Sequence, residues 1–430
     1  MVEATSTYAG RDEIEALSGA RLTAWQHERL REVTDHAYKH VPFYRELWEA
    51  AGIGEDAPSS LEDFERFPII AKDDLIRAGN RWTNPRQGPV AFSTRGTSGD
   101  PLLVWLSAEE EETYIPPTMR GFRWAGFRPG MTALLMSPVW HRLAACEAHA
   151  IARLGGRCAF FWGSMGPEYL DSFLHSLSSV RPEFVTTTAP FLLSLIRRST
   201  NTTIAPDEIL RGVRSVVVVG LPLTPRMREF LRDRLQVDDV FERGGTQEGA
   251  ALDECQWHTA PHVHEDVCYL EVVDDSGVPV APGVRGRLIV TKLSAAGSIF
   301  VRYDTGDFAA FAPGECPCEC GFRRLKIYGR PESSVVVADR RITAYDVRIC
   351  IEEDADLVGR NVLLIREAGS PAGLLTVAIE GGDHHQAELK ARLRERLGVD
   401  TVRIVWLGDL RVNWGFRQVV DSREIRSAGS

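Results

Sequence analysis

Hydrophobic and polar positions alternate in three distinct ways along the chain. Between residues 10 and 53 apolar residues recur at intervals of three or four, which predicts helices. From residue 130 to 300, short β-rich runs alternate with helical stretches, a pattern typical of a parallel sheet covered by helices. The predicted strands are TALLMSPV, RCAFFWGS, EFVTTTAP, SVVVVG and RLIVTKL, and the predicted helices are ACEAHAIARLG, EYLDSFLHSLSSV and PRMREFLRDRLQ.

After about residue 328 the pattern changes. Runs such as NVLLIREAG and LLTVAIEG alternate like half-exposed strands, and the helix HHQAELKARLRERLG follows them. A chain of 430 residues is also too long for one ordinary core. We therefore expect a large α/β domain with several sheets over residues 1–328 and a small α+β domain over 329–430, joined near Tyr328 to Ser334.

Composition narrows the classes of protein. The chain is 44% hydrophobic and 26% charged, as in globular proteins, and it has no long apolar run and no leader-like segment at its start. We therefore expect a cytoplasmic protein that is neither secreted nor inserted in a membrane. The net charge of -10 argues against a nucleic-acid partner, because neutralising phosphates requires a basic face.

The stretch FSTRGTSGDP, residues 92–101, admits two interpretations: a loop that cradles a phosphate, or a plain turn. The flanking runs GPVA and LLVWLS favour two strands of a hairpin. The Gly-Lys-Ser/Thr of a Walker loop is absent, and Asp100 stands where a lysine would be expected.

Two further stretches carry candidate binding residues. FERGGTQEGA, residues 241–250, joins a glycine pair to Glu248, whose carboxylate is a hard ligand suited to Mg²⁺. RYDTGD, residues 302–307, follows a strand and could bind vicinal hydroxyl groups. Each stretch alone is as typical of a turn as of a site.

In this order and spacing, the three stretches and Gly329-Arg330 resemble the adenylate-forming (ANL) superfamily, in its branch of phenylacetate-CoA ligases and coenzyme F390 synthetases. ERLREVTDHAYKHVPFYRELWEAAGI with LEDFERFPIIAKDDL, GLPLTPRMREFL, and GVPVAPGVRGRLIVTKL with VRYDTGD extend the resemblance over nearly the whole chain. It implies the two-domain ANL fold, with a mobile C-terminal domain, and an ATP- and Mg²⁺-dependent ligase.

The resemblance also implies roles for particular residues. The triphosphate loop corresponds to Thr94, Gly96, Thr97, Ser98 and Gly99, and the adenine and magnesium loop to Gly244, Gly245, Thr246, Gln247 and Glu248. Asp307 corresponds to the aspartate that binds the ribose hydroxyls, and Arg330 to a hinge arginine that faces the nucleotide. Thr97 and Glu248 are thereby catalytic candidates.

Four cysteines near one another in the second half predict a metal site, because a dense cysteine group in a chain without a leader is more often a metal site than a disulfide. Some members of the resembled branch carry structural zinc on a Cys, a His seven residues later and a Cys-x-Cys-Gly. Here that implies Cys255, His262 and two of Cys316, Cys318 and Cys320. Gly321 favours Cys318 and Cys320, with Cys316 as the substitute.

The chain departs from the family pattern at several places. Asp100 replaces a lysine of the phosphate loop, Gly244 replaces the aromatic residue that stacks on adenine, and Asp339 replaces a glycine beside the cofactor thiol. The C-terminal lysine that offsets charge as pyrophosphate leaves is also missing, since no lysine follows Lys390. Arg417 is the candidate substitute, with Arg411 as a second.

The function expected is activation of a carboxylic acid as its acyl-adenylate, followed by transfer to CoA or an amine. Thr186 to Phe191 correspond to the wall of the acid pocket, and nearby aromatic residues suit a flat aryl acid or, equally, a packed core. Alternatives are a non-CoA ligase, either amide-forming or activating an oxyanion such as nitrite, and a degenerate homologue that binds ligand without adenylation. A homodimer and a role in secondary metabolism complete the expectations.

Overall fold

The computed structural model describes residues 13–55, 58–94, 100–136, 142–161, 170–199, 210–367, 373–382, 386–407 and 418–421. Contacts divide the chain into two compact units. The first contains residues 1–121, 245–305 and 310–326, and the second contains 122–244, 306–309 and 327–430. Among the described residues, no helix has the length and apolar character needed to span a bilayer.

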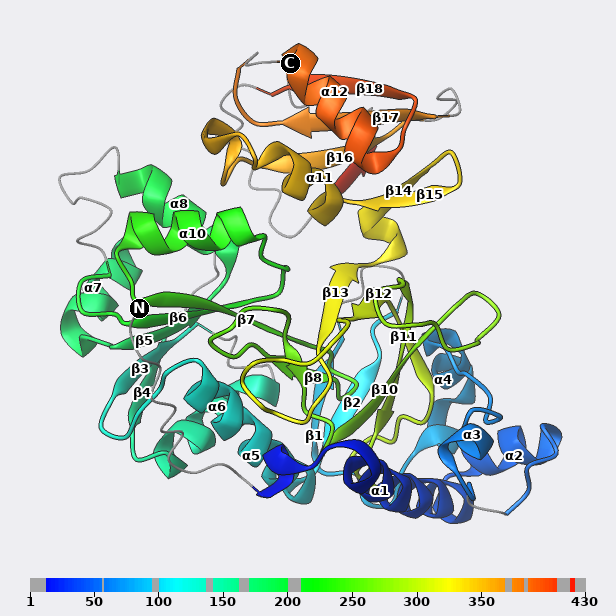
Figure 1. Cartoon of the computed structure of the whole chain (residues 1–430). Helices are drawn as coiled ribbons and strands as arrows, with labels where there is room; N and C mark the ends of the chain where they lie inside the picture. The colour runs from blue at the N-terminus through cyan, green and yellow to red at the C-terminus, as the bar shows by residue number, and fades with distance from the viewer. Residues whose placement is uncertain are drawn as a thin grey trace. The chain divides into compact units, whose positions relative to one another are not determined.

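The first unit combines N-terminal helices with short sheets (Figure 1). Its helices are α1 (Gly19–His40), α2 (Pro42–Ala50), α3 (Leu61–Phe64), α4 (Lys72–Ala78) and most of α5 (Ala108–Trp124), with 3-10 turns at Glu13–Ala16 and Gly79–Trp82. Its strands are β1 (Val90–Ser93), β2 (Leu103–Leu106), β8 (Ala251–Asp253), β9 (His262–Val263), β10 (Cys268–Val273) and β11 (Gly286–Lys292), followed by β12 (Tyr303–Phe311) and β13 (Leu325–Gly329), which reach into the second unit.

The pairing of these strands is antiparallel where their registers are known. β1 pairs with β2, β8 with β9, and β10 with β11. The β10–β11 register sets Cys268 opposite Lys292. Lys292 is the last residue of β11.

The second unit begins with a parallel sheet. Its elements are β3 (Thr132–Leu135), α6 (Arg142–Arg153), β4 (Arg157–Phe160), α7 (Leu170–Val180), β5 (Phe184–Thr187), α8 (Ala189–Ser199), β6 (Ser215–Val219), α10 (Pro225–Leu235) and β7 (Asp239–Gly245). The strand order β4-β3-β5-β6-β7 reverses between β3 and β5. Connections between parallel strands are right-handed, so a helix after the reversal lies on the opposite side of the sheet from a helix before it. Accordingly, α8 and α10 lie on one side of the sheet and α6 on the other (Figure 1). The carboxyl ends of strands beside such a reversal are favoured ligand sites.

The core of this sheet follows from its sequence. Val216 and Val218 are fully buried and pack with Phe173 of α7, Leu192 of α8 and Leu231 of α10. α10 begins where Thr224 accepts a hydrogen bond from the Met227 N–H, and Pro225 occupies its first turn. On one face of the sheet, the uninterrupted apolar run of β6 is therefore covered by α7, α8 and α10.

The C-terminal part of the second unit has its own sheets and core. It contains β14 (Ser334–Val337), β15 (Arg340–Thr343), α11 (Ala344–Ile351), β16 (Val362–Arg366), β17 (Leu374–Ile379), α12 (Gln386–Leu397), β18 (Thr401–Trp406) and β19 (Val419–Asp421), with 3-10 turns at Pro331–Ser333 and Ala355–Leu357. Its larger sheet has the order β18-β17-β16-β19. Leu364, Val377 and Leu393 belong to one buried cluster within this part. A separate core supports the predicted small domain, while the boundary at residue 328 stays a prediction.

Most elements predicted from periodicity are confirmed, including the hairpin at 90–106, four of the five named strands as parallel strands, and the helices α6, α7 and α10. The fifth strand, RLIVTKL, was expected in the parallel sheet, but it is β11, which pairs antiparallel with β10 in another sheet. Among the helices that were not predicted are α8 and the longer α5, which carries Pro116 and Pro117 in its interior. Its start is nevertheless marked, since the Ser107 hydroxyl accepts a hydrogen bond from the Glu110 N–H at 3.1 Å. The mixed α/β fold class is confirmed.

Candidate functional site

The predicted triphosphate loop is closed at its base by Thr94. The Thr94 N–H donates to the Leu102 carbonyl at 2.9 Å, and the Leu102 N–H donates to the Thr94 hydroxyl at 3.0 Å. Thr94 therefore fixes where the loop leaves β1 and returns to β2. Gly96, Thr97, Ser98 and Gly99 lie outside the described residues, and so does Arg417. Asp100 is described and exposed.

The loop after β7 is a tight turn. The Thr246 N–H donates to the Ala250 carbonyl at 3.0 Å, and the Gly249 N–H donates to the Thr246 carbonyl at 3.2 Å. Gly245 has φ of 151°, and a Cβ there would lie 2.5 Å from the Ala250 carbonyl oxygen. The second glycine of the GG pair is therefore required by the close approach of two backbone segments.

The tip of this turn places two polar side chains. Glu248 is only 5% exposed. The Gln247 Oε1 atom is buried and has no hydrogen-bond partner among the described residues. A buried amide oxygen without a partner is costly, so this atom is explained most simply by a ligand that donates to it. Gly244, the last residue but one of β7, is partly buried and has no ring to stack on adenine.

Asp307 and Arg330, predicted separately to face the nucleotide, lie together in the second unit. The Arg330 Nε donates to Asp307 Oδ1 at 3.1 Å. The Asp307 side chain is 12% exposed and that of Arg330 is 35% exposed. An oriented carboxylate suits the vicinal hydroxyls of a ribose, and the guanidinium beside it suits an anionic phosphate.

The carboxyl end of β5 carries the predicted wall of the acid pocket. Thr186 and Thr187 are 1% exposed, and neither hydroxyl has a hydrogen-bond partner among the described residues. The nearby aromatic residues Phe161 and Phe191 belong to the core, because both rings pack edge-on against Phe173. The core interpretation therefore holds for these two rings, while Trp162 lies outside the described residues.

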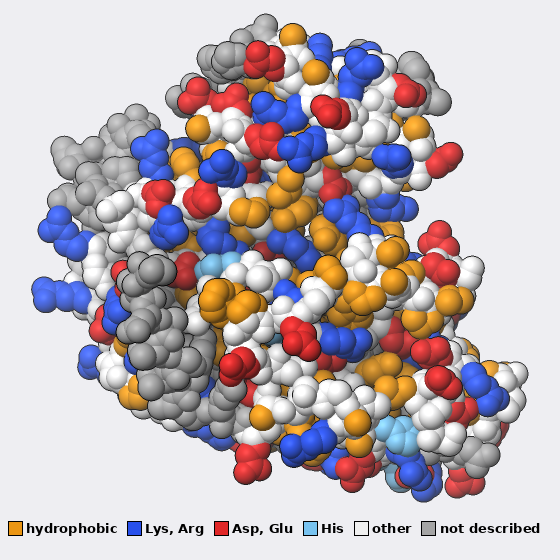
Figure 2. Space-filling view, viewed as in Figure 1, with side chains coloured by type: hydrophobic (Ala, Val, Ile, Leu, Met, Phe, Trp, Pro, Cys, Tyr) orange, Lys and Arg blue, Asp and Glu red, His pale blue; other side chains and the backbone are white. Residues whose placement is uncertain are grey.

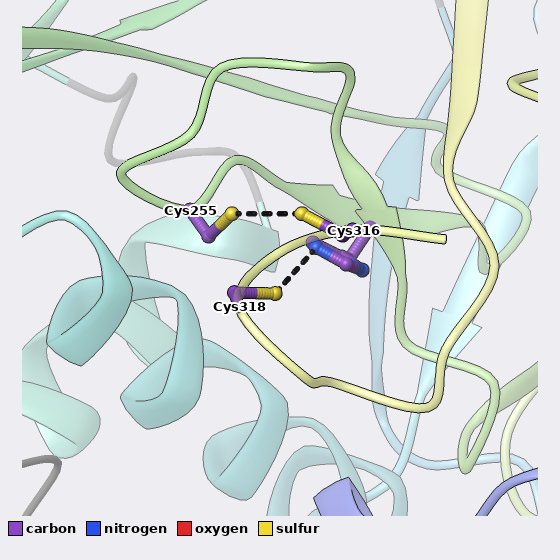
Figure 3. Close-up of side chains that lie close together, drawn as sticks. Cys255, Cys316 and Cys318 are labelled. Carbon is purple, nitrogen blue, oxygen red and sulfur yellow. Dashed lines mark hydrogen bonds between the residues drawn. The ribbon is translucent and has the colours of Figure 1, made fainter. Parts of the chain in front are cut away.

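Three cysteines and a histidine form a compact group in the first unit (Figure 3). The ligand atoms of Cys255, His262, Cys316 and Cys318 all lie within 4.8 Å of one another. The Cys255 and Cys316 sulfurs are 3.6 Å apart, and Cys318 Sγ is 3.3 Å from His262 Nε2. Figure 3 shows Cys255 on the loop after β8, and Cys316 and Cys318 on the loop between β12 and β13.

The residues present fit a tetrahedral zinc ion. Zn–S bonds of about 2.3 Å and a Zn–N bond of about 2.0–2.1 Å place tetrahedral ligand atoms roughly 3.5–3.8 Å apart. The observed separations of 3.6 and 3.3 Å are close to these values. In addition, His262 Nδ1 is 3.0 Å from the Phe322 carbonyl, so a proton on Nδ1 leaves Nε2 as a donor atom facing the sulfurs. None of the eight cysteines forms a disulfide.

The electrostatics of the group agree with a cation site. A hydrogen bond from Cys255 and the neighbouring His262 lower the pKa of the Cys318 thiol to about 3, against the effect of burial. Burial opposes charge on His262, but its contacts with Cys316, Cys318 and Cys320 outweigh this and raise its pKa to about 12. Thiolate character at Cys318 is what a soft divalent metal requires.

The group selects Cys316, whereas the sequence favoured Cys320. The reason lies in a tight turn: the Glu319 N–H donates to the Cys316 carbonyl at 3.2 Å, and Glu319 has φ of 62°. This turn brings the sulfurs of Cys316 and Cys318 to one side. Cys320 remains close enough to contribute to the raised pKa of His262.

Sequence reasoning missed a buried polar network, two of whose members, Asp253 and His264, are each two residues from a member of the cysteine group. Arg120 is fully buried and binds both carboxylate oxygens of Asp266 at 3.0 Å. Arg120 also donates to His264 Nδ1 at 2.9 Å, so His264 Nε2 donates to Asp253 Oδ2 at 2.8 Å. Burial lowers the pKa of His264, in keeping with a neutral ring. His264 is fully buried.

The surface visible in Figure 2 shows basic and acidic side chains interspersed.

The fold resembles that of adenylate-forming enzymes. A family model described as AMP-binding enzyme matches residues 93–298. A solved structure of 2-hydroxyisobutyryl-CoA ligase in complex with 2-HIB-AMP superposes with a TM-score of 0.84 over 97% of this chain and 93% of that chain, at 20% identity. The amide bond synthetase McbA from Marinactinospora thermotolerans superposes with a TM-score of 0.55 over 80% of this chain and 69% of that chain, at 21% identity.

Sequence comparison is more specific. The phenylacetate-coenzyme A ligase of Aromatoleum evansii is 26% identical over 85% of this chain and 83% of its own length. That of Thermus thermophilus is 25% identical over 83% of this chain and 81% of its own length. The chain is therefore similar to AMP-binding, adenylate-forming enzymes and to phenylacetate-CoA ligases, the resemblance expected from the sequence.

Proposed function

We propose that this protein is an ATP- and Mg²⁺-dependent ligase that converts a carboxylic acid to its acyl-adenylate and then transfers the acyl group to CoA. The observation that carries the proposal is the match to the AMP-binding model over residues 93–298, a stretch that contains both the loop between β1 and β2 and the Glu248 turn. The printed names of the curated relatives favour an aromatic acid such as phenylacetate and CoA as the acceptor.

In the first step, a carboxylate oxygen of the acid attacks the α-phosphorus of ATP, and pyrophosphate leaves with the electron pair of the broken P–O bond. Glu248 would hold the Mg²⁺ ion, whose charge offsets that of the phosphates. Backbone N–H groups and hydroxyls of residues 94–99 would bind the triphosphate. Asp307 would accept hydrogen bonds from the ribose hydroxyls, with Arg330 orienting it.

In the second step, the thiol of CoA attacks the acyl carbon, and AMP leaves. Movement of the predicted small domain, residues 329–430, would separate the two steps. The positive charge that assists pyrophosphate departure would come from Arg417, because no lysine follows Lys390. An arginine keeps the charge but spreads it over a planar group, so the first step is expected to be slower than with a lysine.

We also propose that the cysteine group holds a structural zinc ion through Cys255, His262, Cys316 and Cys318. A site with four protein ligands is closed and leaves no position for substrate. Its role would be to join the loop after β8 to the loop between β12 and β13 and thereby support the turn that precedes β8.

One observation favours a different acceptor. Asp339 is exposed and has φ of 62°, in the two-residue turn between β14 and β15 where the resembled family has glycine. The backbone conformation suits glycine, but the carboxylate adds bulk and negative charge where the cofactor thiol would approach. An amine acceptor is the second candidate, and the likeness to an amide bond synthetase is compatible with it.

The test is release of pyrophosphate with a panel of carboxylic acids, first without an acceptor and then with CoA or with amines. Acid-dependent release of pyrophosphate from ATP, with thioester formed when CoA is added, is the expected result. Release with amide formation instead would favour the second candidate. MgATP binding without any acid-dependent release would contradict both and leave a non-adenylating homologue.

A further inference from the structure

The turn that carries Glu248 is supported from behind by side chains that neither the sequence pattern nor the family resemblance identified. They come from α5 and from the end of β11, and all lie in the first unit with the turn itself. We propose that Tyr114 and Lys292 are positioning residues that fix the orientation of the Glu248 carboxylate for metal and nucleotide. This inference rests on the proposed function.

The first contact is a hydrogen bond. Tyr114 is 5% exposed, and its hydroxyl donates to the Gly249 carbonyl at 3.0 Å. Because Gly249 directly follows Glu248, this bond fixes one end of the short segment whose other end is held by the Thr246 turn. The backbone of Glu248 thus has little freedom to rotate.

The second contact is steric. Lys292 is 1% exposed, and a Cβ built on Gly249 would lie 3.2 Å from its Cγ and 2.8 Å from the Tyr114 hydroxyl. Gly249 also has φ of 124°, a conformation that L-residues rarely adopt. The turn is therefore pressed directly against the lysine stem and the tyrosine.

The lysine is itself held rigidly. Its Nζ donates to the Ala296 carbonyl at 2.6 Å and pairs with Glu110 Oε1 at 3.0 Å, and Glu110 is fully buried. Glu110 and Tyr114 are four residues apart and so lie on one face of α5. One helix face thereby fixes both groups that support the turn.

The identity of Lys292 adds weight to this inference. The chain has only five lysines among 50 basic residues, and the other side chains of this charge are arginines. A linear stem ending in a compact ammonium can pass beside Gly249 and still reach Glu110, whereas a planar guanidinium is wider. We therefore expect Lys292→Arg to displace the turn although it keeps the charge.

The experiment measures MgATP binding to the full-length protein by titration calorimetry, together with steady-state kinetics. Tyr114→Phe should weaken MgATP binding about tenfold, the usual size of an effect exerted through a ligand's supporting residue. The KM for the carboxylic acid, the metal content and the unfolding temperature should stay as in the unaltered protein. Lys292→Arg should change MgATP binding in the same direction.

Tyr38→Phe is the matched control, because the Tyr38 hydroxyl also donates a hydrogen bond, to Glu49 at 2.9 Å, but at the exposed surface of α1. It should leave every quantity unchanged. Unaltered MgATP binding by Tyr114→Phe would overturn the inference. So would a loss accompanied by an equal rise in the acid KM and a lower unfolding temperature, since that pattern indicates general loosening.

Glu248→Gln in the same titration separates this inference from the proposed function. If Glu248→Gln weakens binding and Tyr114→Phe does not, only the positioning role is wrong. If neither change has an effect, the proposed role of Glu248 fails, and the positioning role fails with it.

Discussion

Two parts of the first unit are suited to bind a cation, but they differ in the number of ligand atoms that the protein supplies. The cysteine group gathers four ligand atoms within 4.8 Å from segments up to 63 residues apart, between Cys255 and Cys318. The Glu248 turn offers one buried carboxylate, held by its own backbone, Tyr114 and Lys292. The first arrangement can enclose an ion by itself, whereas the second has to share one with a substrate.

This difference reflects the chemistry of the two ions. Structural zinc takes all four ligands from the protein, so the cysteines and the histidine in the sequence indicate the whole site. Magnesium in nucleotide enzymes is bound through one or two carboxylates plus the phosphates, and it keeps several waters. In the sequence, the magnesium site is therefore visible only as a single acidic residue. The orientation of its carboxylate is fixed by the side chains that pack behind it.

The largest effect is expected from Cys316→Ser. Structural zinc contributes about 10–16 kcal/mol in small zinc domains, which is comparable with the whole stability of a typical domain, about 5–15 kcal/mol. We expect the purified variant to have lost the metal and to unfold at a much lower temperature. Metal analysis and thermal unfolding check this, and a variant that keeps both zinc and stability would show that Cys316 is not a ligand.

A smaller and different effect is expected from Glu248→Gln. Loss of one charged group that acts on developing charge typically lowers the rate a hundredfold to a thousandfold, about 2.7–4 kcal/mol. Acid-dependent pyrophosphate release should fall by that amount, while zinc content and unfolding temperature stay unchanged. Glu229→Gln on α10, at an exposed glutamate paired with Arg226, is the control and should have no effect. Full activity of Glu248→Gln would remove this residue from the mechanism.

Asp307→Asn should have an intermediate effect on binding. Hydrogen bonds to charged groups contribute about 1.5–3 kcal/mol, so MgATP affinity should fall by roughly 10- to 150-fold. Asp304→Asn is a close control, because Asp304 lies on the same strand and also pairs with an arginine, Arg287 at 2.5 Å. Equal losses in both variants would indicate an effect on β12 rather than on ribose binding.

The smallest effect is expected from Cys320→Ser. Cys320 lies near His262 but outside the group of four ligand atoms. The variant should therefore retain about one equivalent of zinc, as a closed four-ligand site requires. If Cys320→Ser loses the metal and Cys316→Ser keeps it, the ligand set that the sequence favoured would be the correct one.

Much of the fold could be predicted because local signals agreed with it. Thr224 and Pro225 mark the start of α10, and the apolar run of β6 indicates a strand buried on both faces. α5 could not be predicted in this way, since Pro116 and Pro117 argue against a helix interior. Contacts distant in sequence, such as that of Arg120 with Asp266, favour the helix regardless.

The candidate site shows the same limit. The spacing of cysteines indicated a metal site, and the glycine pair with Glu248 indicated a close turn. The choice of Cys316 over Cys320 depends on the turn at Glu319, which no spacing rule specifies. Tyr114 and Lys292 carry no motif at all; the only available signal was that lysine is rare in this chain.

The most direct test of the central claim is a calorimetric titration of the full-length protein with MgATP, repeated with Glu248→Gln and with EDTA in place of free Mg²⁺. The account predicts saturable binding that weakens strongly in both comparisons, while the zinc content of the variant stays unchanged. Absence of heat with millimolar MgATP, or equal affinity with and without the Glu248 carboxylate, would contradict it.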